Sequence, residues 1–167
     1  MSKLYLLCGV PGSGKSTWVQ KRIEEHNEQN ESCVWHSRDA VRFSLLKDEE
    51  DYFAKEDEVI AQWLENIQTS IILDVEHIYV DATHLSPTAR AKVLDALCLT
   101  DVAIIPVNFL IPLNTCLERN ELRKGIGRTY VPRGVIRRMF IQFKPAAHGE
   151  KYIYTDIINI KEDEKDA

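Results

Sequence analysis

The sequence has few cysteines, and none of them is arranged as a zinc finger or a disulfide framework would require. Four cysteines occur among 167 residues, with no C-x-x-C pair and no cluster of histidine and cysteine at zinc spacing. Three of the four lie in apolar segments, which is typical of reduced core thiols in a cytosolic protein. A disulfide-stapled scaffold and a zinc finger are therefore excluded.

Long apolar runs and a strong charge of one sign are also missing. No segment approaches the ~18 consecutive apolar residues of a membrane span, and the apolar run at the amino terminus is too short for a signal peptide. The net charge of −5 argues against a protein that coats nucleic acid through a broad basic surface. We expect a soluble cytoplasmic protein without a membrane partner, folded as a single domain over residues 1–167.

The positive charge that is present gathers in one segment. Residues 119–138 hold seven basic residues and one acidic residue, whereas the rest of the chain holds fourteen basic and twenty-five acidic residues. An acidic body with one basic segment predicts a local anion-binding site. No internal repeat, low-complexity segment or long linker interrupts the chain.

Glycine is scarce as well, yet three of the seven glycines fall within GVPGSGKST at residues 9–17. This segment satisfies G-x-x-x-x-G-K-[S/T], the pattern of a phosphate-binding loop, in which backbone N–H groups wrap a polyphosphate where no Cβ blocks the approach. Free N–H groups at the start of the following helix add to the attraction. The residues expected to bind the nucleotide are Gly9, Gly12, Ser13, Gly14, Lys15, Ser16 and Thr17.

Two residues of this loop have separate expected roles. Lys15 is expected to reach the β- and γ-phosphates of ATP, and the Ser16 hydroxyl is expected to bind Mg²⁺. The alternative is a glycine-rich turn with an incidental lysine. However, the apolar run at 4–8 has the form of a buried strand, and Trp18 and Ile23 open an amphipathic helix. Strand, loop and helix follow in the order that the motif requires, which favours nucleoside triphosphate binding.

Apolar runs that alternate with helical patterns indicate the fold class. Segments of the strand type occupy residues 4–8, 33–35, 78–80, 102–110 and 153–160. Helical patterns cover residues 18–30, 38–46, 53–71, 89–99, 112–119 and 132–143. We expect an α/β fold of the P-loop kinase type, with a five-stranded parallel sheet and helices on both faces. Ligands of such sheets bind at the carboxyl ends of the strands.

The segment RDAVR at residues 38–42 follows the second expected strand. Ser37 is expected to cap a helix that places Arg38 and Arg42 one turn apart on the same face. Asp39 lies in the first turn, where the helix dipole keeps a carboxylate ionised. A hydroxyl that accepts a phosphoryl group needs a base and a charged acceptor needs arginine, so we expect Asp39 to be catalytic and both arginines to bind the acceptor. The alternative is a helix-starting acid with two solvated arginines.

A second polar group, DATH, follows the third expected strand. Asp81 is expected to bind Mg²⁺ through water or to position the acceptor, and Asp39 is the alternative carboxylate for the metal. Thr83 and His84 are expected to contact the acceptor. The alternative is an ordinary loop that caps the next helix.

Asp74 offers a competing metal ligand. It follows the apolar residues 71–73, which together resemble the apolar run with a terminal aspartate that binds metal in many NTPases. Strands that end at both Asp74 and Asp81 would be crowded, and Ile71 continues the helical spacing of the segment before it. Asp81 is therefore preferred.

Glycines break the basic segment between two expected helices. Gly125 and Gly127 interrupt residues 119–131, a composition that suits a lid over the triphosphate. The lid residues expected at the nucleotide phosphates are Arg119, Arg123 and Arg128, and Arg123 is also expected to be catalytic. The basic residues beyond the lid are expected either to grip a polyanionic acceptor or to form a solvated face; they are Arg133, Arg137 and Arg138.

The order of these segments carries a resemblance to a known family. GVPGSGKSTW, SRDAVR, VDATHLSPTAR and RNELRKG, with a proline-started helix after them, resemble the phage polynucleotide 5′-kinase family within the P-loop kinases. The likeness covers nearly the whole chain and only the kinase part of that family. The loop is shared by many NTPases, whereas R-D-x-x-R is considerably more selective.

This resemblance implies specific roles. It implies that Asp39 is the general base for a 5′-hydroxyl and that Arg42 contacts a phosphate of the acceptor. It also implies that Asp81 helps to hold the acceptor and that Arg123 contacts the donor phosphates. The family often has Asn shortly after the position of Asp81, where this chain has Ala-Thr-His, so the acceptor contacts differ there.

Together, these patterns predict a kinase that uses ATP and Mg²⁺ and transfers the γ-phosphate to a hydroxyl, with the 5′ end of a nucleic acid as the expected acceptor. One alternative is a small-molecule kinase for a nucleoside, sugar or antibiotic, because the fold does not fix the acceptor. Another is an ATPase or nucleotide switch without an acceptor. A GTPase is disfavoured because the sequence has no N-K-x-D guanine motif.

Overall fold

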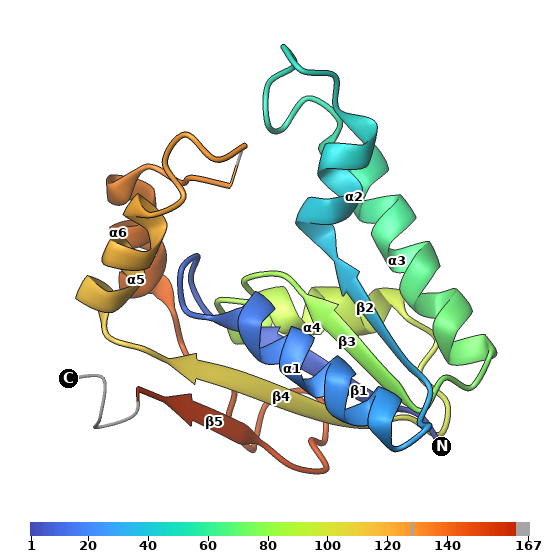
Figure 1. Cartoon of the computed structure of the whole chain (residues 1–167). Helices are drawn as coiled ribbons and strands as arrows, with labels where there is room; N and C mark the ends of the chain where they lie inside the picture. Colours follow the sequence, from blue (N-terminus) through green and yellow to red (C-terminus); the bar gives the residue numbers. More distant parts are fainter. Residues whose placement is uncertain (128, 163–167) are drawn as a thin grey trace.

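Five parallel strands form the centre of the structure (Figure 1). The computed structural model describes residues 1–127 and 129–162. Its strands are β1 Lys3–Cys8, β2 Cys33–Ser37, β3 His77–Asp81, β4 Ala103–Leu110 and β5 Ile158–Lys161. They lie in the order β2-β3-β1-β4-β5, and all neighbouring pairs are parallel. The predicted α/β fold with a five-stranded parallel sheet is thereby confirmed.

Six helices in the described residues connect and cover the strands (Figure 1). They are α1 Lys15–Glu28, α2 Arg38–Leu45, α3 Glu56–Ile72, α4 Pro87–Ala96, α5 Leu113–Glu121 and α6 Arg133–Gln142. Polar residues cap two of the helix starts: the Ser37 hydroxyl accepts a hydrogen bond from the Ala40 N–H, and Ser86 caps α4 through Ala89. Because each strand leads into a helix and the next strand runs parallel to it, the carboxyl ends of the strands share one edge of the sheet.

The two faces of the sheet carry separate hydrophobic cores, because successive side chains of a strand point to opposite faces. On one face Leu6 of β1 packs in a cluster with Trp63 of α3 and Leu94 of α4. On the other face Leu7 packs in a cluster with Val19 of α1 and with residues of α5 and α6. The sheet is thus the middle of three layers, and its central strands β1, β3 and β4 are almost entirely buried, as expected of parallel strands covered on both sides.

Two of the element boundaries that differ from the prediction involve exposed apolar side chains. The last strand spans Ile158–Lys161 and not residues 153–160, because Ile153 is 92% exposed and the backbone reaches the edge of the sheet only after Ile157. The long helix begins at Glu56 and not at Phe53, which is 64% exposed in the preceding turn. Three acidic residues in the first turn of α3 favour this start through the helix dipole.

The competing placement of a metal ligand at Asp74 is wrong. Helix α3 continues through Ile72, and Asp74 follows in a left-handed turn with φ of 51°. This turn precedes β3, so Asp74 lies at the amino end of the sheet, where its carboxylate is 3.9 Å from the amino group of Met1. Asp81, in contrast, is the last residue of β3, at the end of the sheet where the phosphate-binding loop begins.

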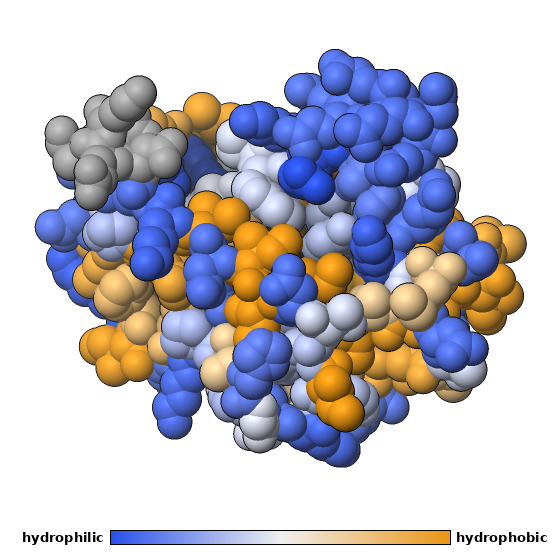
Figure 2. Space-filling view, turned by 90° about the horizontal axis from the view of Figure 1, so that it is seen from below, coloured by the Kyte–Doolittle hydropathy of each residue, from blue (hydrophilic) through white to orange (hydrophobic). Residues whose placement is uncertain are grey.

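The surface shows no large segregation of apolar groups on the side seen in Figure 2, where apolar patches alternate with charged and polar residues. Within residues 1–127 and 129–162, no helix combines the length and the apolar character that crossing a bilayer would need.

Candidate phosphotransfer site

The phosphate-binding loop connects β1 to α1 through a backbone that only glycine adopts easily. Gly12 and Gly14 have φ of 82° and 94°, in the left-handed region that disfavours residues with a Cβ. A Cβ on Gly12 would also lie 2.4 Å from the carbonyl oxygen of Cys116 in α5. The loop therefore packs closely against α5, and its curvature leaves the amino end of α1 open toward the carboxyl edge of the sheet.

Lys15 is folded over this loop. Its ammonium donates hydrogen bonds to the carbonyl oxygens of Gly9 at 2.8 Å and Val10 at 3.2 Å. Burial lowers the pKa of Lys15, and the neighbouring carboxylates of Asp81 and Asp39 oppose that shift. The charge of Lys15 is thus held at the point where the motif requires a phosphate partner.

Asp81 occupies the end of β3 and is nearly enclosed, with 8% of its surface exposed. The Trp35 indole N–H donates to its Oδ2 at 3.0 Å, which fixes the carboxylate beside β2. Burial raises the pKa of Asp81, and the charge of Lys15 works in the opposite direction. The charges of Asp81 and Lys15 are therefore close enough at the floor of the site for each to affect the pKa of the other.

Asp39 lies one strand further along, in the first turn of α2, and 60% of its side chain is exposed. The Tyr52 hydroxyl donates a hydrogen bond of 2.5 Å to Oδ1 of Asp39, and Arg42 forms an ion pair with the same oxygen. The carboxylate is therefore oriented from one side and open to solvent on the other.

Arg42 is the centre of this arrangement and is only 1% exposed. Its Nε and Nη2 bind both carboxylate oxygens of Glu56 at 2.6–3.2 Å, and Nη1 donates to the Tyr52 hydroxyl at 2.7 Å and to Asp39. The guanidinium also stacks on the Tyr52 ring, 4.2 Å from its centroid. All three nitrogen atoms of the guanidinium thereby have hydrogen-bond partners within the protein.

The contact of Arg42 with an acceptor phosphate stays a prediction. In this structure the guanidinium binds Glu56, Tyr52 and Asp39, so such a contact would have to share or replace one of these partners. Sequence reasoning missed Tyr52 and Glu56, which lie 13 and 14 residues from the groups they bind. Glu56 falls within the helical pattern predicted for residues 53–71, and no periodic pattern marks it or Tyr52 as a partner of Arg42.

Arg38 and Thr83 are two further residues that the sequence places at the acceptor. Arg38 is half-buried and lies over the Trp63 ring, 5.6 Å from its centroid. Thr83 is half-buried, and its carbonyl accepts the Gly9 N–H at 2.9 Å. Both lie at the carboxyl edge of the sheet. Their expected contacts with an acceptor stay predictions.

His84 is a buried residue whose expected contact with an acceptor stays a prediction. It is 4% exposed, and its Nδ1–H donates to the carbonyl oxygen of Leu7 at 2.6 Å. The ring stacks on Trp63, and burial lowers the pKa of His84 to about 3, so the imidazole is neutral. The bond from Nδ1–H holds the end of β1 against the loop after β3, while Nε2 is buried and has no hydrogen-bond partner among the described residues.

The segment predicted as a lid connects α5 to α6 beside a cavity of about 560 Å³. The cavity is lined by residues of the phosphate-binding loop, of α1, of β4 and β5 and of α5, among them Ser13, Gly14, Thr17, Trp18, Phe109, Arg119 and Arg123. Arg123 also lies close enough to Lys15 to lower its pKa. Arg128, the third predicted lid arginine, lies outside the described residues.

A buried asparagine, Asn120, connects the two ends of this segment. Sequence reasoning also missed this residue. Asn120 is fully buried; its Nδ2 donates to the carbonyl oxygen of Val131 at 2.6 Å, and its Oδ1 accepts the Val131 N–H at 3.0 Å. Arg133 pairs with Glu121 at 3.3 Å across the same base. The paired contacts fix where the segment leaves α5 and where it returns to α6.

The loop, its strand and its helix match a known family. A family model of an AAA domain, AAA_33, matches residues 4–146. The chain belongs to this AAA domain family. The family match and the strand order together confirm the predicted P-loop kinase likeness of the fold.

Solved structures support the same fold for this AAA_33 chain. A chain of the Pnkp1/Rnl/Hen1 RNA repair complex has a TM-score of 0.70 and 22% identity, over 90% of this chain and 50% of that one. A fungal RNA kinase has a TM-score of 0.61 and 13% identity, over 99% and 78% of the two chains. The Mycobacterium tuberculosis APS kinase CysC, solved with AMPPNP and APS, has a TM-score of 0.56 and 20% identity, over 95% and 88%.

These neighbours share a kinase-like P-loop fold with the chain, and at such identities the likeness concerns the fold alone. The chain spans half the length of the Pnkp1 complex chain that it matches. The neighbours named above carry different acceptors in their names, so the fold is compatible with phosphoryl transfer to more than one class of hydroxyl.

Proposed function

We propose that this AAA_33 chain is an ATP- and Mg²⁺-dependent kinase that phosphorylates the 5′-hydroxyl of a polynucleotide. The observation that carries the proposal is the convergence of four charged groups from four separate segments. Lys15 of the loop has Asp39, Asp81 and Arg123 close enough to change its pKa. Two cations and two carboxylates at the mouth of a phosphate-binding loop are what phosphoryl transfer requires.

The donor half is supported by the shape of the loop and its cavity. Backbone N–H groups around Gly12 and Gly14 can approach phosphates because neither residue carries a Cβ. The ribose and base of the nucleotide would then enter the cavity beside Trp18 and Phe109, which offer apolar surface next to the loop. The oxygen ligands available for Mg²⁺ are the exposed Ser16 hydroxyl and the carboxylates of Asp81 or Asp39, a donor set that suits this hard cation.

The chemistry follows from the charges around Lys15. The acceptor oxygen attacks the γ-phosphorus of ATP, the bond to the β-γ bridging oxygen breaks and ADP leaves. Asp39 receives the proton of the hydroxyl, while Lys15 and Arg123 stabilise the charge on the transferring phosphoryl group. Bound Mg²⁺ would neutralise charge on the β- and γ-phosphates.

We assign Arg42 a positioning role in this reaction. Both Arg42 and Tyr52 bind Oδ1 of Asp39, which leaves Oδ2 as the oxygen that can face the hydroxyl. Glu56 in turn fixes the guanidinium with bidentate geometry. Asp39 therefore needs little rearrangement to act as a base when an acceptor arrives.

A polynucleotide acceptor is favoured over a small molecule by the basic surface beyond the site. Arg137 and Arg138 on α6 are exposed, in a chain whose overall charge is −5. Two of the structural neighbours are an RNA repair complex and an RNA kinase by name. The second candidate is a small-molecule kinase, which the likeness to APS kinase favours.

The test is transfer of labelled γ-phosphate from ATP to a panel of 5′-hydroxyl oligonucleotides, mononucleotides, sugars and APS, with and without Mg²⁺. We expect labelled 5′ ends on the oligonucleotides and none on sugars or APS. Labelling of a small acceptor alone would replace the proposal with the second candidate. ATP hydrolysis that is as fast without any acceptor would contradict both.

A further inference from the structure

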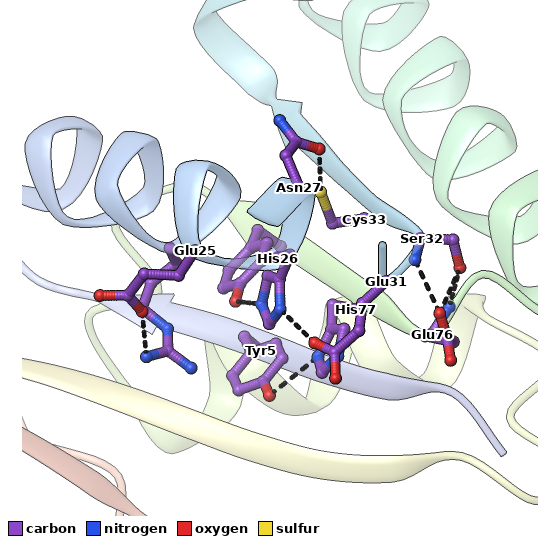
Figure 3. A network of polar contacts seen from close by, with 11 residues as sticks. Tyr5, Glu25, His26, Asn27, Glu31, Ser32, Cys33, Glu76 and His77 are labelled. Atoms are coloured by element: carbon purple, nitrogen blue, oxygen red, sulfur yellow. Dashed lines mark hydrogen bonds and ion pairs between the residues drawn. The ribbon is translucent and has the colours of Figure 1, made fainter. Parts of the chain in front are cut away.

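A second cluster of chemically active side chains lies at the opposite end of the sheet from the phosphate-binding loop (Figure 3). It consists of His26 in the last turn of α1, Glu31 in the turn before β2, and His77, the first residue of β3. The nearest ligand atoms of these three side chains lie within 4.8 Å of one another. The phosphotransfer site does not use any of them.

The backbone brings Glu31 to His26 by a helix-ending turn. Asn30 adopts the left-handed conformation with φ of 57°, and the Glu31 N–H donates to the carbonyl oxygen of His26 at 3.0 Å. This is the Schellman pattern, in which the chain reverses tightly after a helix. His77 reaches the cluster from β3, because the parallel pairing of β2 and β3 places it beside Cys33 at the start of β2.

Glu31 is the point where the two imidazoles meet. Its Oε2 is 2.7 Å from Nδ1 of His26 and 3.1 Å from Nε2 of His77. The two rings are stacked with centroids 3.7 Å apart, so both nitrogens face the same side. Figure 3 shows the carboxylate lying across the edges of the two rings.

The second nitrogen of each imidazole has a tyrosine partner. Nε2 of His26 is 2.7 Å from the Tyr79 hydroxyl, and Nδ1 of His77 is 3.2 Å from the Tyr5 hydroxyl. Tyr5 and Tyr79 are paired across β1 and β3 and stacked on each other. An outer hydrogen-bond partner that fixes the orientation and tautomer of each imidazole is what histidine ligands of a metal almost always have.

We propose that His26, Glu31 and His77 form a binding site for one Zn²⁺-class transition-metal cation. Two imidazoles and a carboxylate, with a water molecule as fourth ligand, are a ligand set that Zn²⁺ binds with tetrahedral geometry. Nitrogen ligands disfavour Mg²⁺, which prefers oxygen, so this site is distinct in its chemistry from the phosphate-binding loop. The proposal does not depend on the proposed kinase activity.

The tyrosine hydroxyls let the cluster exist in two protonation patterns. Without metal, each tyrosine donates to its imidazole, and the imidazole N–H groups on the other side donate to Glu31. With metal, the hydrogen bonds reverse: each imidazole donates to its tyrosine, and the nitrogens beside Glu31 present lone pairs to the cation. A hydroxyl serves either pattern because it both donates and accepts.

The fit requires movements of the carboxylate and of the two rings. Ligand atoms at tetrahedral zinc lie about 3.3 Å apart for bond lengths of about 2.0–2.1 Å, so Glu31 must retreat by a few tenths of an ångström from both imidazoles. The stacked rings must also tilt apart, because the lone pair of each nitrogen lies in the plane of its ring and both must point at one cation. Glu31 has the most room to move, because 36% of its side chain is exposed, whereas the histidine side chains are only 4% and 9% exposed. The same exposure gives a cation access from solvent.

The charges around the cluster are mixed. Lys3 lies close enough to His77 to lower its pKa, although burial is the larger cause of that shift. Arg22 lies near both tyrosines, but its guanidinium is paired with Glu25 at 2.7 Å.

The test is a calorimetric titration of the metal-stripped full chain with ZnCl₂ at neutral pH, with Mg²⁺ in excess to occupy oxygen sites. A Cys98→Ser background removes an exposed thiol that binds zinc on its own account. We expect one Zn²⁺ per chain and a rise in Tm of ~5 °C at saturating metal, because the cation binds only the folded state.

Variants of the cluster residues distinguish zinc binding at this site from adventitious zinc binding elsewhere on the chain. Glu31→Gln and His77→Gln are expected to weaken zinc binding by at least about 100-fold, and Tyr5→Phe by about 10–100-fold through loss of the outer hydrogen bond. His148→Gln, at an exposed histidine outside the cluster, is the matched control and should change nothing. If His77→Gln fails to fold, Glu31→Gln still decides, because Glu31 lies in a half-exposed turn. No uptake by the parent chain, or equal affinity in the parent and Glu31→Gln, would overturn the proposal.

Discussion

The donor and acceptor halves of the candidate site are built by different means. The donor half is a single continuous loop whose backbone does the binding, with Lys15 folded onto its own carbonyl oxygens. The acceptor half is a network of side chains, in which Asp39 is held by Arg42 and Tyr52 and Arg42 is held by Glu56. Substitutions in the donor half should therefore remove one function at a time, whereas those in the acceptor half should be coupled to each other and to stability.

The largest effect is expected in the donor half. Lys15→Ala removes the charge that meets the β- and γ-phosphates, so phosphate transfer should fall by orders of magnitude while the fold stays intact. Steady-state label transfer and thermal unfolding measure the two properties. Lys92→Ala, at an exposed cation of α4 that does not line the cavity, is the control. Unchanged turnover in Lys15→Ala would refute the donor assignment.

Arg42→Ala should disturb both activity and stability. It leaves Glu56 and Asp39 without their shared partner, so we expect a loss of about 2–3 kcal/mol in the free energy of unfolding. Activity should fall by a similar factor on a 5′-hydroxyl nucleoside and on the same nucleoside with a 3′-phosphate, because Arg42 acts through Asp39. A loss confined to the phosphorylated acceptor would support the direct contact expected from the sequence. Arg42→Lys, which keeps the charge, serves if the alanine variant does not fold.

Arg123→Ala should lower kcat more than ATP affinity. Its guanidinium lines the donor cavity, and its contact with the transferring phosphoryl group is expected mainly in the reacting state. Turnover under saturating ATP and equilibrium binding of a non-hydrolysable analogue separate the two quantities. A weaker affinity with unchanged kcat would make Arg123 a ground-state binding residue. Lys92→Ala, on the exposed face of α4, controls for loss of a surface charge.

The smallest effect is expected for Tyr52→Phe. The ring remains to stack on Arg42, but the hydrogen bond to Oδ1 of Asp39 is lost, which corresponds to about 1 kcal/mol or about fivefold in rate. The loss should disappear when Asp39 is already Asn, since Tyr52 acts only through that carboxylate. A double-mutant cycle on kcat measures this coupling. Independent, additive losses would show that Tyr52 acts elsewhere.

The strand, loop and helix of the donor half could be predicted from the sequence for a physical reason. The glycines of the loop are close together in the chain, and the backbone geometry between a buried strand and a helix favours them. The parallel sheet and the position of Asp81 at the end of the third strand followed from apolar runs that end in polar residues. These signals are local, so they can be read without knowing the tertiary structure.

The acceptor half was less predictable because its geometry depends on contacts between segments that are distant in the sequence. Nothing in the pattern around Tyr52 and Glu56 indicates that they turn back onto Arg42. His84 follows a strand in a polar segment, which suggested exposure, yet its ring is packed on Trp63. The approach of His77 to His26 likewise depends on the register of β2 and β3.

The most direct test of the account is Asp39→Asn in the label-transfer assay with a 5′-hydroxyl oligonucleotide, alongside ATP binding. Asparagine keeps the size of the side chain and a hydrogen-bond acceptor but cannot take a proton at neutral pH. The account predicts a loss of about 10²–10⁴ in transfer rate, the usual contribution of a general base, with ATP affinity nearly unchanged. Asp57→Asn, at an exposed acid in the first turn of α3, should transfer at the normal rate. Transfer by Asp39→Asn at the rate of the parent protein would contradict the account.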